Sequence, residues 1–220
     1  MIIYYTDKYY GSRGESHRLL EKAFAVHTDD EERAKTLIGA MKKGEHGKPY
    51  IEGFCCFSIS HTGSIWAVLI AERECGLDIQ LSRKCNIRAI AERWFAPEDA
   101  AVITELCSKD ETEFCNKNEV ELYDQAESSE KYGEDAIDAF FHIWARREAL
   151  TKALGSTVYD PDLPAVTGAE AEISGKHYML ADIAFPDSIN RDLYHMLYAA
   201  VCAEGMEDCF TDSDVSFCLL

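Results

Sequence analysis

An uninterrupted run of seven apolar residues, IWAVLIA at 65–71, most strongly constrains the fold of this chain. A run of this length between turn residues is typical of a strand that is buried on both faces. The preceding residues, FSIS at 57–60, alternate between apolar and polar side chains, and Thr62, Gly63 and Ser64 supply a turn. The pattern predicts a β-hairpin whose second strand lies inside the protein.

Strand and helix patterns alternate along the rest of the sequence. We expect strands at 2–5, 76–80, 178–183 and 194–202, and helices at 16–25, at 87–95, from Pro97, and at 136–154. Residues 28–44 are compatible with a helix that Thr28 and Glu31 cap, or with a short strand at 36–38. The sequence therefore predicts an α+β fold in which residues 178–183 and 194–202 pair as antiparallel strands.

Residues 108–135 differ in composition from their surroundings. They contain ten acidic and three basic residues and few large aliphatic side chains. Such a segment buries too little apolar surface to fold on its own, so we expect a solvated, mobile loop inserted into the domain.

The composition indicates a globular protein of the cytoplasm. A chain of 220 residues that is 47% hydrophobic can form a full core in one large domain or two small ones. No apolar run approaches the roughly 18 residues that span a bilayer, and the first residues lack the layout of a signal peptide. Nine cysteines without zinc-site spacing favour reduced thiols.

The net charge of −18 excludes general affinity for nucleic acids or anionic membranes, because a field of that sign repels phosphate polymers. Residues 8–48 depart from this balance, with nine basic against seven acidic side chains. A small phosphorylated ligand would meet the least electrostatic repulsion in that part of the chain.

Asp78 and Gln80 form a first candidate pair of metal ligands. Because they lie two residues apart on an expected strand, both side chains point to the same face. A carboxylate beside a carboxamide offers oxygen ligands to a hard cation. An aspartate after a glycine also commonly caps a turn, so the pair alone does not decide between these readings.

Glu148 and Lys152 lie at helical spacing on the same stripe as Phe141 and Trp144. On a solvated face they would be an ordinary i, i+4 ion pair. The aromatic residues indicate that this stripe faces inward, where a carboxylate needs a cation. That cation is either Lys152 or a metal that Glu148 shares with Asp78.

Polar residues in two turns could bind phosphate. Pro49 holds the backbone of Lys48 extended, so that its ammonium group projects from a turn. Ser60 and His61, followed by Thr62 and Gly63, can donate to phosphate oxygens through side chains and backbone N–H groups. A surface lysine and a polar hairpin end are the alternative readings.

Four motifs occur in series: GKP at 47–49, FSISHTG at 57–63, GLDI at 76–79 and WARREALTK at 144–152. In this order and spacing the chain resembles the single-chain 4′-phosphopantetheinyl transferases that activate peptide and polyketide synthases. The resemblance implies two similar α+β halves related by a pseudo-twofold axis, each with an antiparallel sheet packed on helices, and coenzyme A bound between them. We place an N-terminal half at 1–74 and a C-terminal half at 75–220, with the acidic insertion at 108–135.

The resemblance also implies the roles of individual residues. Asp78 and Glu148 match the family's metal-binding acids, and Gln80 stands where the family has a further acid. Coenzyme A phosphates would contact residues that match basic or hydroxyl positions of the family, namely Arg18, Lys48, Ser60, His61 and Lys152. Glu148, Lys152 and His61 would be the catalytic residues.

The implied enzyme is a holo-[acyl-carrier-protein] synthase. It would use Mg²⁺ to transfer 4′-phosphopantetheine from coenzyme A to a serine of an acyl or peptidyl carrier protein, and it would release adenosine 3′,5′-bisphosphate. We expect a monomer that needs neither nucleic acid nor membrane. A non-catalytic coenzyme A-binding module and a metal-dependent diphosphate hydrolase are the alternatives.

Overall fold

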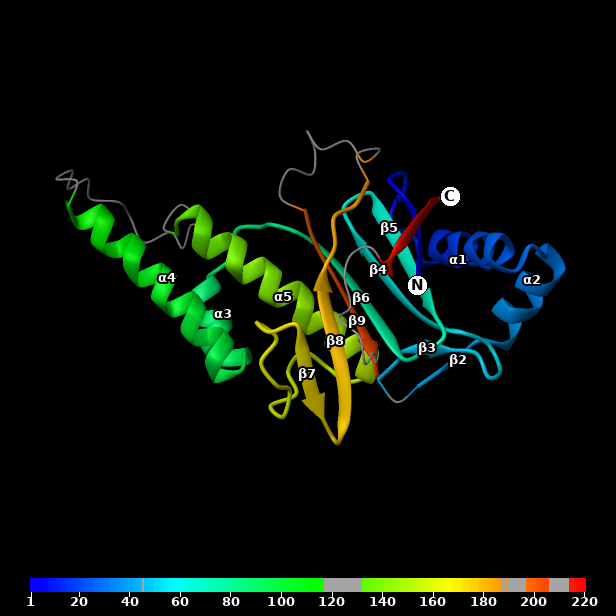
Figure 1. Ribbon diagram of the computed structural model, residues 1–220. Helices are drawn as coiled ribbons and strands as arrows, with labels where there is room; N and C mark the ends of the chain where they lie inside the picture. The colour runs from blue at the N-terminus through cyan, green and yellow to red at the C-terminus, as the bar shows by residue number, and fades with distance from the viewer. Residues whose placement is uncertain (45, 117–131, 187–188, 190–196, 206–213) are drawn as a thin grey trace.

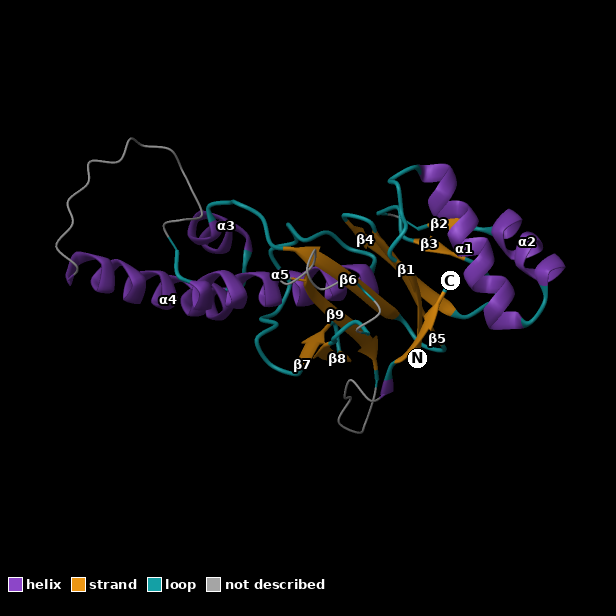
Figure 2. Cartoon of the chain, turned by 90° about the horizontal axis from the view of Figure 1, so that it is seen from above, coloured by secondary structure: helices purple, strands orange, loops and turns teal. Residues whose placement is uncertain are grey.

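The fold is α+β, with two four-stranded sheets at its centre and helices at both ends (Figures 1 and 2). The computed structural model describes residues 1–44, 46–116, 132–186, 189, 197–205 and 214–220. Helices α1 and α2 lie at one end of the molecule and α3 and α4 at the other. The sheets and α5 lie between them.

The first sheet has the strand order β10-β1-β5-β4. Its strands are β1 (Ile2–Thr6), β4 (Cys56–Thr62), β5 (Ile65–Ala71) and β10 (Ser216–Leu219). Neighbouring strands are antiparallel except for β1 and β10, which are parallel. Helices α1 (Arg13–Thr28) and α2 (Glu31–Ala40) pack on one face of this sheet.

The apolar run that predicts a fully buried strand forms β5, and all seven of its residues are buried. Alternate side chains pack on the side of α1 and α2, namely Trp66, Val68 and Ile70. The others enter a core that the first sheet shares with the second, namely Ile65, Ala67, Leu69 and Ala71. The predicted hairpin of β4 and β5 is confirmed.

The second sheet is antiparallel throughout and has the order β6-β9-β8-β7. Its strands are β6 (Cys75–Leu81), β7 (Glu170–Ile173), β8 (Lys176–Asp182) and β9 (Leu197–Glu204). Helix α5 (Glu134–Leu154) covers the face that points away from the shared core, and α3 (Ile87–Trp94) and α4 (Pro97–Asn116) pack beside it. A short ribbon, β2 (Lys42–Lys43) and β3 (Pro49–Tyr50), stands apart from both sheets.

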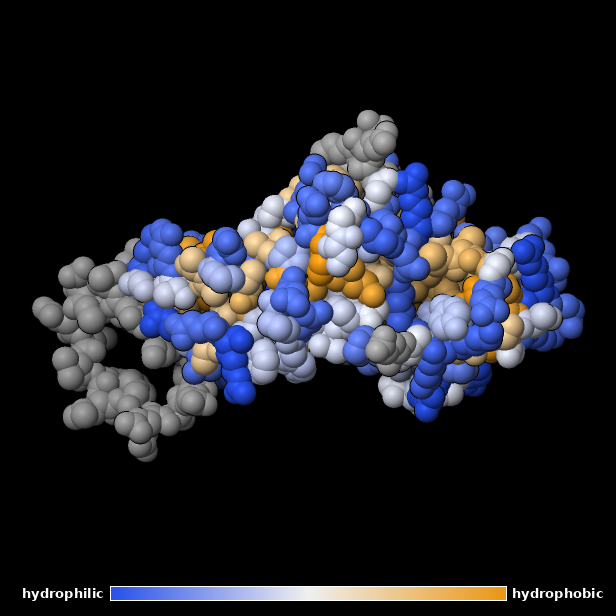
Figure 3. All heavy atoms as spheres, turned by 90° about the horizontal axis from the view of Figure 1, so that it is seen from below, coloured by the Kyte–Doolittle hydropathy of each residue, from blue (hydrophilic) through white to orange (hydrophobic). Residues whose placement is uncertain are grey.

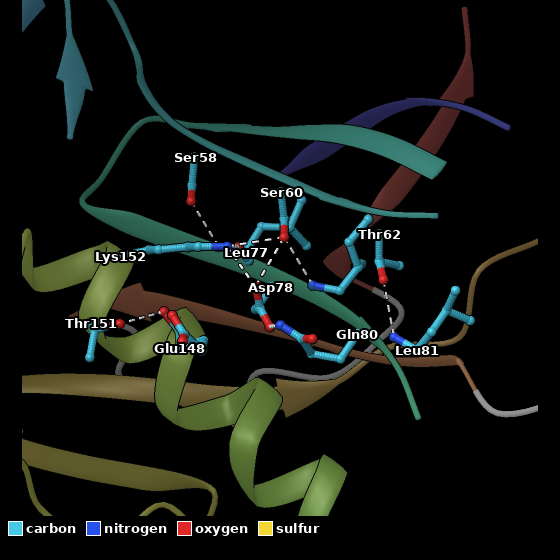
Figure 4. Close-up of polar contacts among 11 residues, drawn as sticks. Ser58, Ser60, Thr62, Leu77, Asp78, Gln80, Leu81, Glu148, Thr151 and Lys152 are labelled. Atoms are coloured by element: carbon cyan, nitrogen blue, oxygen red, sulfur yellow. Dashed lines mark hydrogen bonds and ion pairs between the residues drawn. The ribbon is translucent and has the colours of Figure 1, made fainter. Parts of the chain in front are cut away.

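Hydroxyl groups of β4 join the two sheets along a seam, which we define by Ser58, Ser60 and Thr62. These three side-chain oxygens accept hydrogen bonds from the backbone N–H groups of alternate residues of β6, at 3.0, 3.2 and 3.2 Å, namely Leu77, Ile79 and Leu81. Residues two apart on a strand share a face, so the spacing of the hydroxyls matches that of the N–H groups. Figure 4 shows the seam beside Asp78 of β6.

Gly76 allows α5 to lie directly against β6. A Cβ atom at this position would overlap the carbonyl oxygen of Ala149 and come within 2.7 Å of the backbone nitrogen of Ala153. The helix stops at Gly155, whose φ of 66° lies in the left-handed region that glycine adopts at helix ends. The predicted helix at 136–154 is confirmed, with its start two residues earlier.

Within the segment at 28–44, helix α2 occupies Glu31–Ala40, so the alternative strand at 36–38 is wrong. The N-cap of α2 is Asp30, whose carboxylate accepts from the backbone N–H of Arg33, rather than Thr28. The Thr28 hydroxyl instead donates to the carbonyl of Phe24 at the end of α1. None of the helices in the described ranges combines the length and apolar character that crossing a membrane requires.

Both ends of the acidic segment at 108–135 are helical, so the predicted loop is wrong there. Its first part, residues 108–116, continues α4, and its last two residues belong to the first turn of α5. One ion pair at helical spacing supports this part of α4, since Lys109 lies 2.8 Å from Glu105. Residues 117–131 lie outside the part of the chain that the structure describes.

Substitution of Gly76 by alanine should destabilise the protein and displace α5. Because backbone atoms of α5 occupy the space of the new methyl group, we expect a loss of about 1–3 kcal/mol in the free energy of unfolding. Urea denaturation measures it. Gly39→Ala near the end of α2 is the control, because no atom lies within 4 Å of the added Cβ. Equal stabilities of the two variants would contradict the close approach.

Candidate active site

Asp78 is the most enclosed acidic group of the candidate site, with 2% of its surface exposed. Its Oδ1 accepts from Lys152 Nζ at 2.6 Å and from Ser60 Oγ at 3.0 Å. Its Oδ2 accepts from Gln80 Nε2 at 2.9 Å. The strand, the seam and α5 therefore all contact one carboxylate (Figure 4).

Lys152 connects α5 to β6. Besides Asp78, its ammonium group donates to Ser60 Oγ and to the carbonyl of Leu77, both at 3.0 Å. The side chain is 29% exposed, so this ion pair lies at the edge of the solvent rather than in the core. The helical spacing places Glu148 one turn before Lys152 on the same side of α5, as the sequence predicts.

Glu148 is half-buried, and its carboxylate makes no hydrogen bond to the described residues. Burial raises the pKa of Glu148, and the negative charge of Asp78 raises it further, while Lys152 and Arg147 act in the opposite direction. Two carboxylates from different elements therefore face each other with an incomplete balance of positive charge. This is the environment in which a bound cation would be most favourable.

The donor set fits Mg²⁺ better than a transition metal. Asp78 and Glu148 supply carboxylate oxygens, and Gln80 lies beside Asp78 with its Nε2 toward that carboxylate and its amide oxygen directed away from it. Oxygen ligands of this kind suit hard cations. Among the described residues no group of three or more His, Cys, Asp or Glu side chains has the arrangement of a metal site, so two carboxylates carry the charge.

Ser60 and His61 point to opposite sides of β4. The Ser60 hydroxyl lies in the seam, in contact with Asp78 and Lys152. The His61 ring is exposed and packs against Tyr9, with 5.2 Å between the ring centroids. Successive residues of a strand alternate in direction, so the predicted pair is divided between two surfaces.

Arg18 lies on the exposed surface of α1. No hydrogen bond or ion pair joins its side chain to another described residue, and the structure does not bring it into contact with Asp78 or Lys152. It lies on the same helix as Ser16, whose hydroxyl accepts from Trp66 Nε1 at 2.8 Å. Because Trp66 pairs with His61 across the hairpin, the start of α1 lies near the His61 end of β4.

Lys48 contacts neither Asp78 nor Glu148. Its ammonium group lies 2.6 Å from Glu74 Oε2, 2.9 Å from the carbonyl of Ala153 and 3.4 Å from the carbonyl of Cys75. A cavity of about 380 Å³ adjoins this group and is also lined by Tyr50, Lys176 and Tyr178. A larger cavity of about 830 Å³, lined by His27, Cys55 and Arg73 among others, contains none of the predicted site residues.

A second contact between α5 and the sheet was not expected from the sequence. Arg146 donates to both carboxylate oxygens of Asp182 on β8, at 2.8 and 2.9 Å, and also to the carbonyls of residues 166–168. The imidazole of His142 lies 3.4 Å from the same carboxylate. These contacts hold the middle of α5 on the sheet on which Asp78 lies.

Ser58 and Glu74 are further residues that the sequence analysis did not single out, and Thr62 lies in the seam on β4 rather than in the predicted turn. The recurrence of hydroxyl side chains at every second residue of 58–62 is a signal that could have indicated a polar strand edge. Glu74 carries no comparable signal, because its partner Lys48 is 26 residues away.

Comparisons with known proteins match the part of the chain that contains β6 and α5. A family model described as the 4′-phosphopantetheinyl transferase superfamily matches residues 74–176. "4′-phosphopantetheinyl transferase AcpT" of Salmonella typhimurium is 28% identical over 131 residues, which is 58% of this chain and 55% of that protein. "4′-phosphopantetheinyl transferase gsp" of Aneurinibacillus migulanus is 27% identical over 121 residues, 55% of this chain and 40% of that protein.

The segment at 74–176, somewhat less than half of this chain, is similar to the 4′-phosphopantetheinyl transferase superfamily. The matches span about half the length of these relatives. The segment that the family model covers contains Asp78, Gln80, Glu148 and Lys152, whereas Ser60 precedes it.

The raised pKa of Glu148 makes the stability of the protein depend on pH. The folded chain holds the Glu148 proton more tightly than the unfolded chain, in which the pKa of this carboxyl group is near 4.5. As pH rises above 4.5, the unfolding free energy of the unmodified protein should therefore fall relative to that of Glu148→Gln. The difference between the two proteins should become constant once the pH exceeds the pKa of Glu148 in the folded state.

Thermal unfolding of both proteins with a chelator, between about pH 4 and about pH 8, measures this difference. Glu92→Gln on the exposed side of α3 is the control. A parent that gains stability relative to Glu148→Gln over this interval would show that Lys152 outweighs burial.

Proposed function

We propose that this protein transfers the 4′-phosphopantetheine group of coenzyme A to a serine hydroxyl of an acyl or peptidyl carrier protein. The observation that carries the proposal is the meeting of Asp78, Glu148 and Lys152 in the segment that the family model matches. The names of the similar proteins support the same activity. Adenosine 3′,5′-bisphosphate would be the second product.

In this proposal Asp78 and Glu148 hold Mg²⁺, with the amide oxygen of Gln80 or a water molecule as a further ligand. When bound, Mg²⁺ supplies positive charge that offsets the charge of the diphosphate. The raised pKa of Glu148 supports this assignment, because a cation would relieve the repulsion between the two carboxylates.

Lys152 would contribute positive charge to the leaving group. All three of its N–H donors have partners in the structure, namely Asp78, Ser60 and Leu77. Binding of a diphosphate would therefore require an exchange of one of these contacts for a phosphate oxygen. On the other side of β4, His61 and Arg18 are exposed and could donate to further phosphate groups of coenzyme A.

The reaction forms a bond between the serine oxygen and the phosphorus that carries pantetheine, and it breaks the bond from that phosphorus to the bridging oxygen of the diphosphate. Alignment and charge compensation matter more here than covalent catalysis. The serine proton needs an acceptor. We propose Glu148, because its carboxylate makes no hydrogen bond to the described residues and can accept a proton through an oxygen that does not hold Mg²⁺.

We further propose that residues 1–74 and 75–220 form two halves related by a pseudo-twofold axis. Similar sequences at 67–72 and 199–204 support this, because they lie on β5 and β9, each the second strand from the seam in its sheet. β10 is the exception, since it joins the sheet of the first half. That the protein acts as a monomer in the cytoplasm stays a prediction from its sequence.

The carrier protein would have to recognise a local surface. The net charge of −18 provides no long-range attraction for an acidic partner. On the face that Figure 3 shows, apolar side chains form separate areas between hydrophilic ones. Contact with the carrier would therefore combine such an area with nearby basic groups.

Incubation with coenzyme A, Mg²⁺ and a panel of carrier proteins separates the proposal from its alternatives. A mass gain on the carrier would support the transferase. Cleavage of coenzyme A without a mass gain would instead support a hydrolase, and binding without turnover a non-catalytic module.

Removal of either proposed metal ligand should abolish transfer. We expect Glu148→Ala and Asp78→Ala to lower the transfer rate at least roughly 100-fold, because each removes charge that compensates the transition state. Circular dichroism should show that the folded structure persists, and Glu92→Ala on the surface of α3 should retain activity. Near-normal turnover of the Glu148 variant would refute the metal site.

Gln80→Glu should tighten the binding of Mg²⁺. The third carboxylate would face Asp78 Oδ2, so without metal we expect a lower Tm, and with Mg²⁺ a half-maximal rate at a concentration on the order of tenfold lower. Thermal unfolding and rates over a Mg²⁺ titration measure both effects. An unchanged Mg²⁺ dependence would place Gln80 outside the metal site.

A further inference from the structure

Lys48 and Glu74 form an ion pair at the point where the last turn of α5 meets the start of β6. The Lys48 ammonium group lies 2.6 Å from Glu74 Oε2, and its side chain is 19% exposed. The same group donates to the carbonyl of Ala153 on α5 and to that of Cys75 on β6. One lysine thus joins the carbonyl groups of Cys75 and Ala153, which are 78 residues apart in sequence.

The contact with α5 provides a hydrogen-bond donor to a carbonyl group in the last turn of the helix. The last carbonyl groups of a helix have no partner within the helix, and a positive charge near them is favourable. Lys48 supplies both a donor and a charge to Ala153, in the turn that ends at Gly155. The backbone of Gly155 lies close to the lysine stem, since an added Cβ would come within 3.7 Å of Lys48 Cδ.

Glu74 fixes the ammonium group from the other side. Its Oε2 accepts from Lys48, and its Oε1 lies 3.7 Å from the thiol of Cys56 on β4. The carboxylate thereby ties the turn that carries Lys48 to the first sheet as well as to β6. All three donors of the ammonium group are occupied within the protein.

This ion pair lies next to the candidate active site. Ala153 directly follows Lys152, and Cys75 lies two residues before Leu77, whose carbonyl accepts from Lys152. The last turn of α5 is therefore attached to β6 at two neighbouring points, one through Lys48 and one through Lys152. Movement at the first point would shift the ammonium group that contacts Asp78 at the second.

We propose that Lys48 and Glu74 are positioning residues that hold the last turn of α5, and with it Lys152, at the distance from Asp78 that the reaction requires. The proposal rests on the proposed transferase function for its kinetic consequences. It gives Lys48 a different role from the phosphate contact that the family resemblance implies. The rival model is that Lys48 binds phosphate in the adjoining cavity of about 380 Å³.

Glu74→Gln distinguishes the two models because it removes the negative charge that pairs with Lys48 and leaves the ammonium group in place. If Lys48 positions α5, both Glu74→Gln and Lys48→Met should lower kcat, on the order of 10-fold to 100-fold. The KM for coenzyme A should change by less than about threefold. Lys48→Arg, which keeps the charge and the donors, should restore part of the rate.

The phosphate-contact model predicts the opposite pattern. Lys48→Met would then raise the KM for coenzyme A and weaken its binding in calorimetry, whereas Glu74→Gln would leave binding unchanged or tighten it. That result would overturn the proposal. Lys176→Met is the matched control, because Lys176 lines the same cavity and pairs with Glu204, at 3.0 Å, away from α5.

Hydrogen exchange tests the positioning role without any turnover. Backbone amides in the last turn of α5, residues 150–154, should exchange faster in Lys48→Met and in Glu74→Gln than in the parent and in Lys176→Met. The double variant should exchange no faster than either single one, since both remove the same contact. Unchanged exchange in the two variants would refute the positioning role. If the variants exchange faster but the parent shows no transferase activity, only the proposed function is refuted.

Discussion

The hydrogen bonds between the hydroxyl groups of β4 and the backbone of β6 determine where the candidate site forms. β4 and β6 are edge strands of different sheets, and edge strands carry unpaired N–H groups that need partners. Ser58, Ser60 and Thr62 satisfy three of them with side-chain oxygens. Because a hydroxyl accepts and donates at once, Ser60 also binds Asp78. The joint between the sheets is therefore part of the site.

The close packing of α5 on β6 adds the second acid and the lysine. Gly76 removes the side chain that would keep the helix away, so Glu148 and Lys152 reach the face of the sheet that carries Asp78. Lys152 neutralises Asp78 directly, which leaves Glu148 in a half-buried place without a described partner. A raised pKa is the physical consequence of that imbalance, and it makes the site suited to a cation.

Local patterns were sufficient to predict the elements and one part of the site. The periodicity of 57–71 and of 136–154 correctly predicted the hairpin and α5, because apolar spacing reports directly on which face is buried. The same reasoning placed Glu148 and Lys152 on one inward stripe of α5, but it offered Lys152 as the partner of Glu148, whereas the ammonium group contacts Asp78. It could not place Lys48, because neither propensity nor spacing reveals that the end of a distant helix will meet a lysine in a turn. The loop expected at 108–116 was wrong because charged residues also form solvated helices.

The family match covers only some of the residues of the candidate site. Residues 74–176 contain both carboxylates, Gln80 and Lys152, whereas the hydroxyls of the seam, Lys48, His61 and Arg18 lie before that segment. The groups that would compensate charge at the reacting phosphate thus belong to β6 and α5. Lys48 and the hydroxyls of the seam, which orient these two elements together with Glu74 and Arg146, belong to the part of the chain before that segment, as do His61 and Arg18, which would face the rest of a bound nucleotide. A substitution at Ser60 should therefore act on Asp78 and Lys152 through their geometry, although it removes no charge from the site.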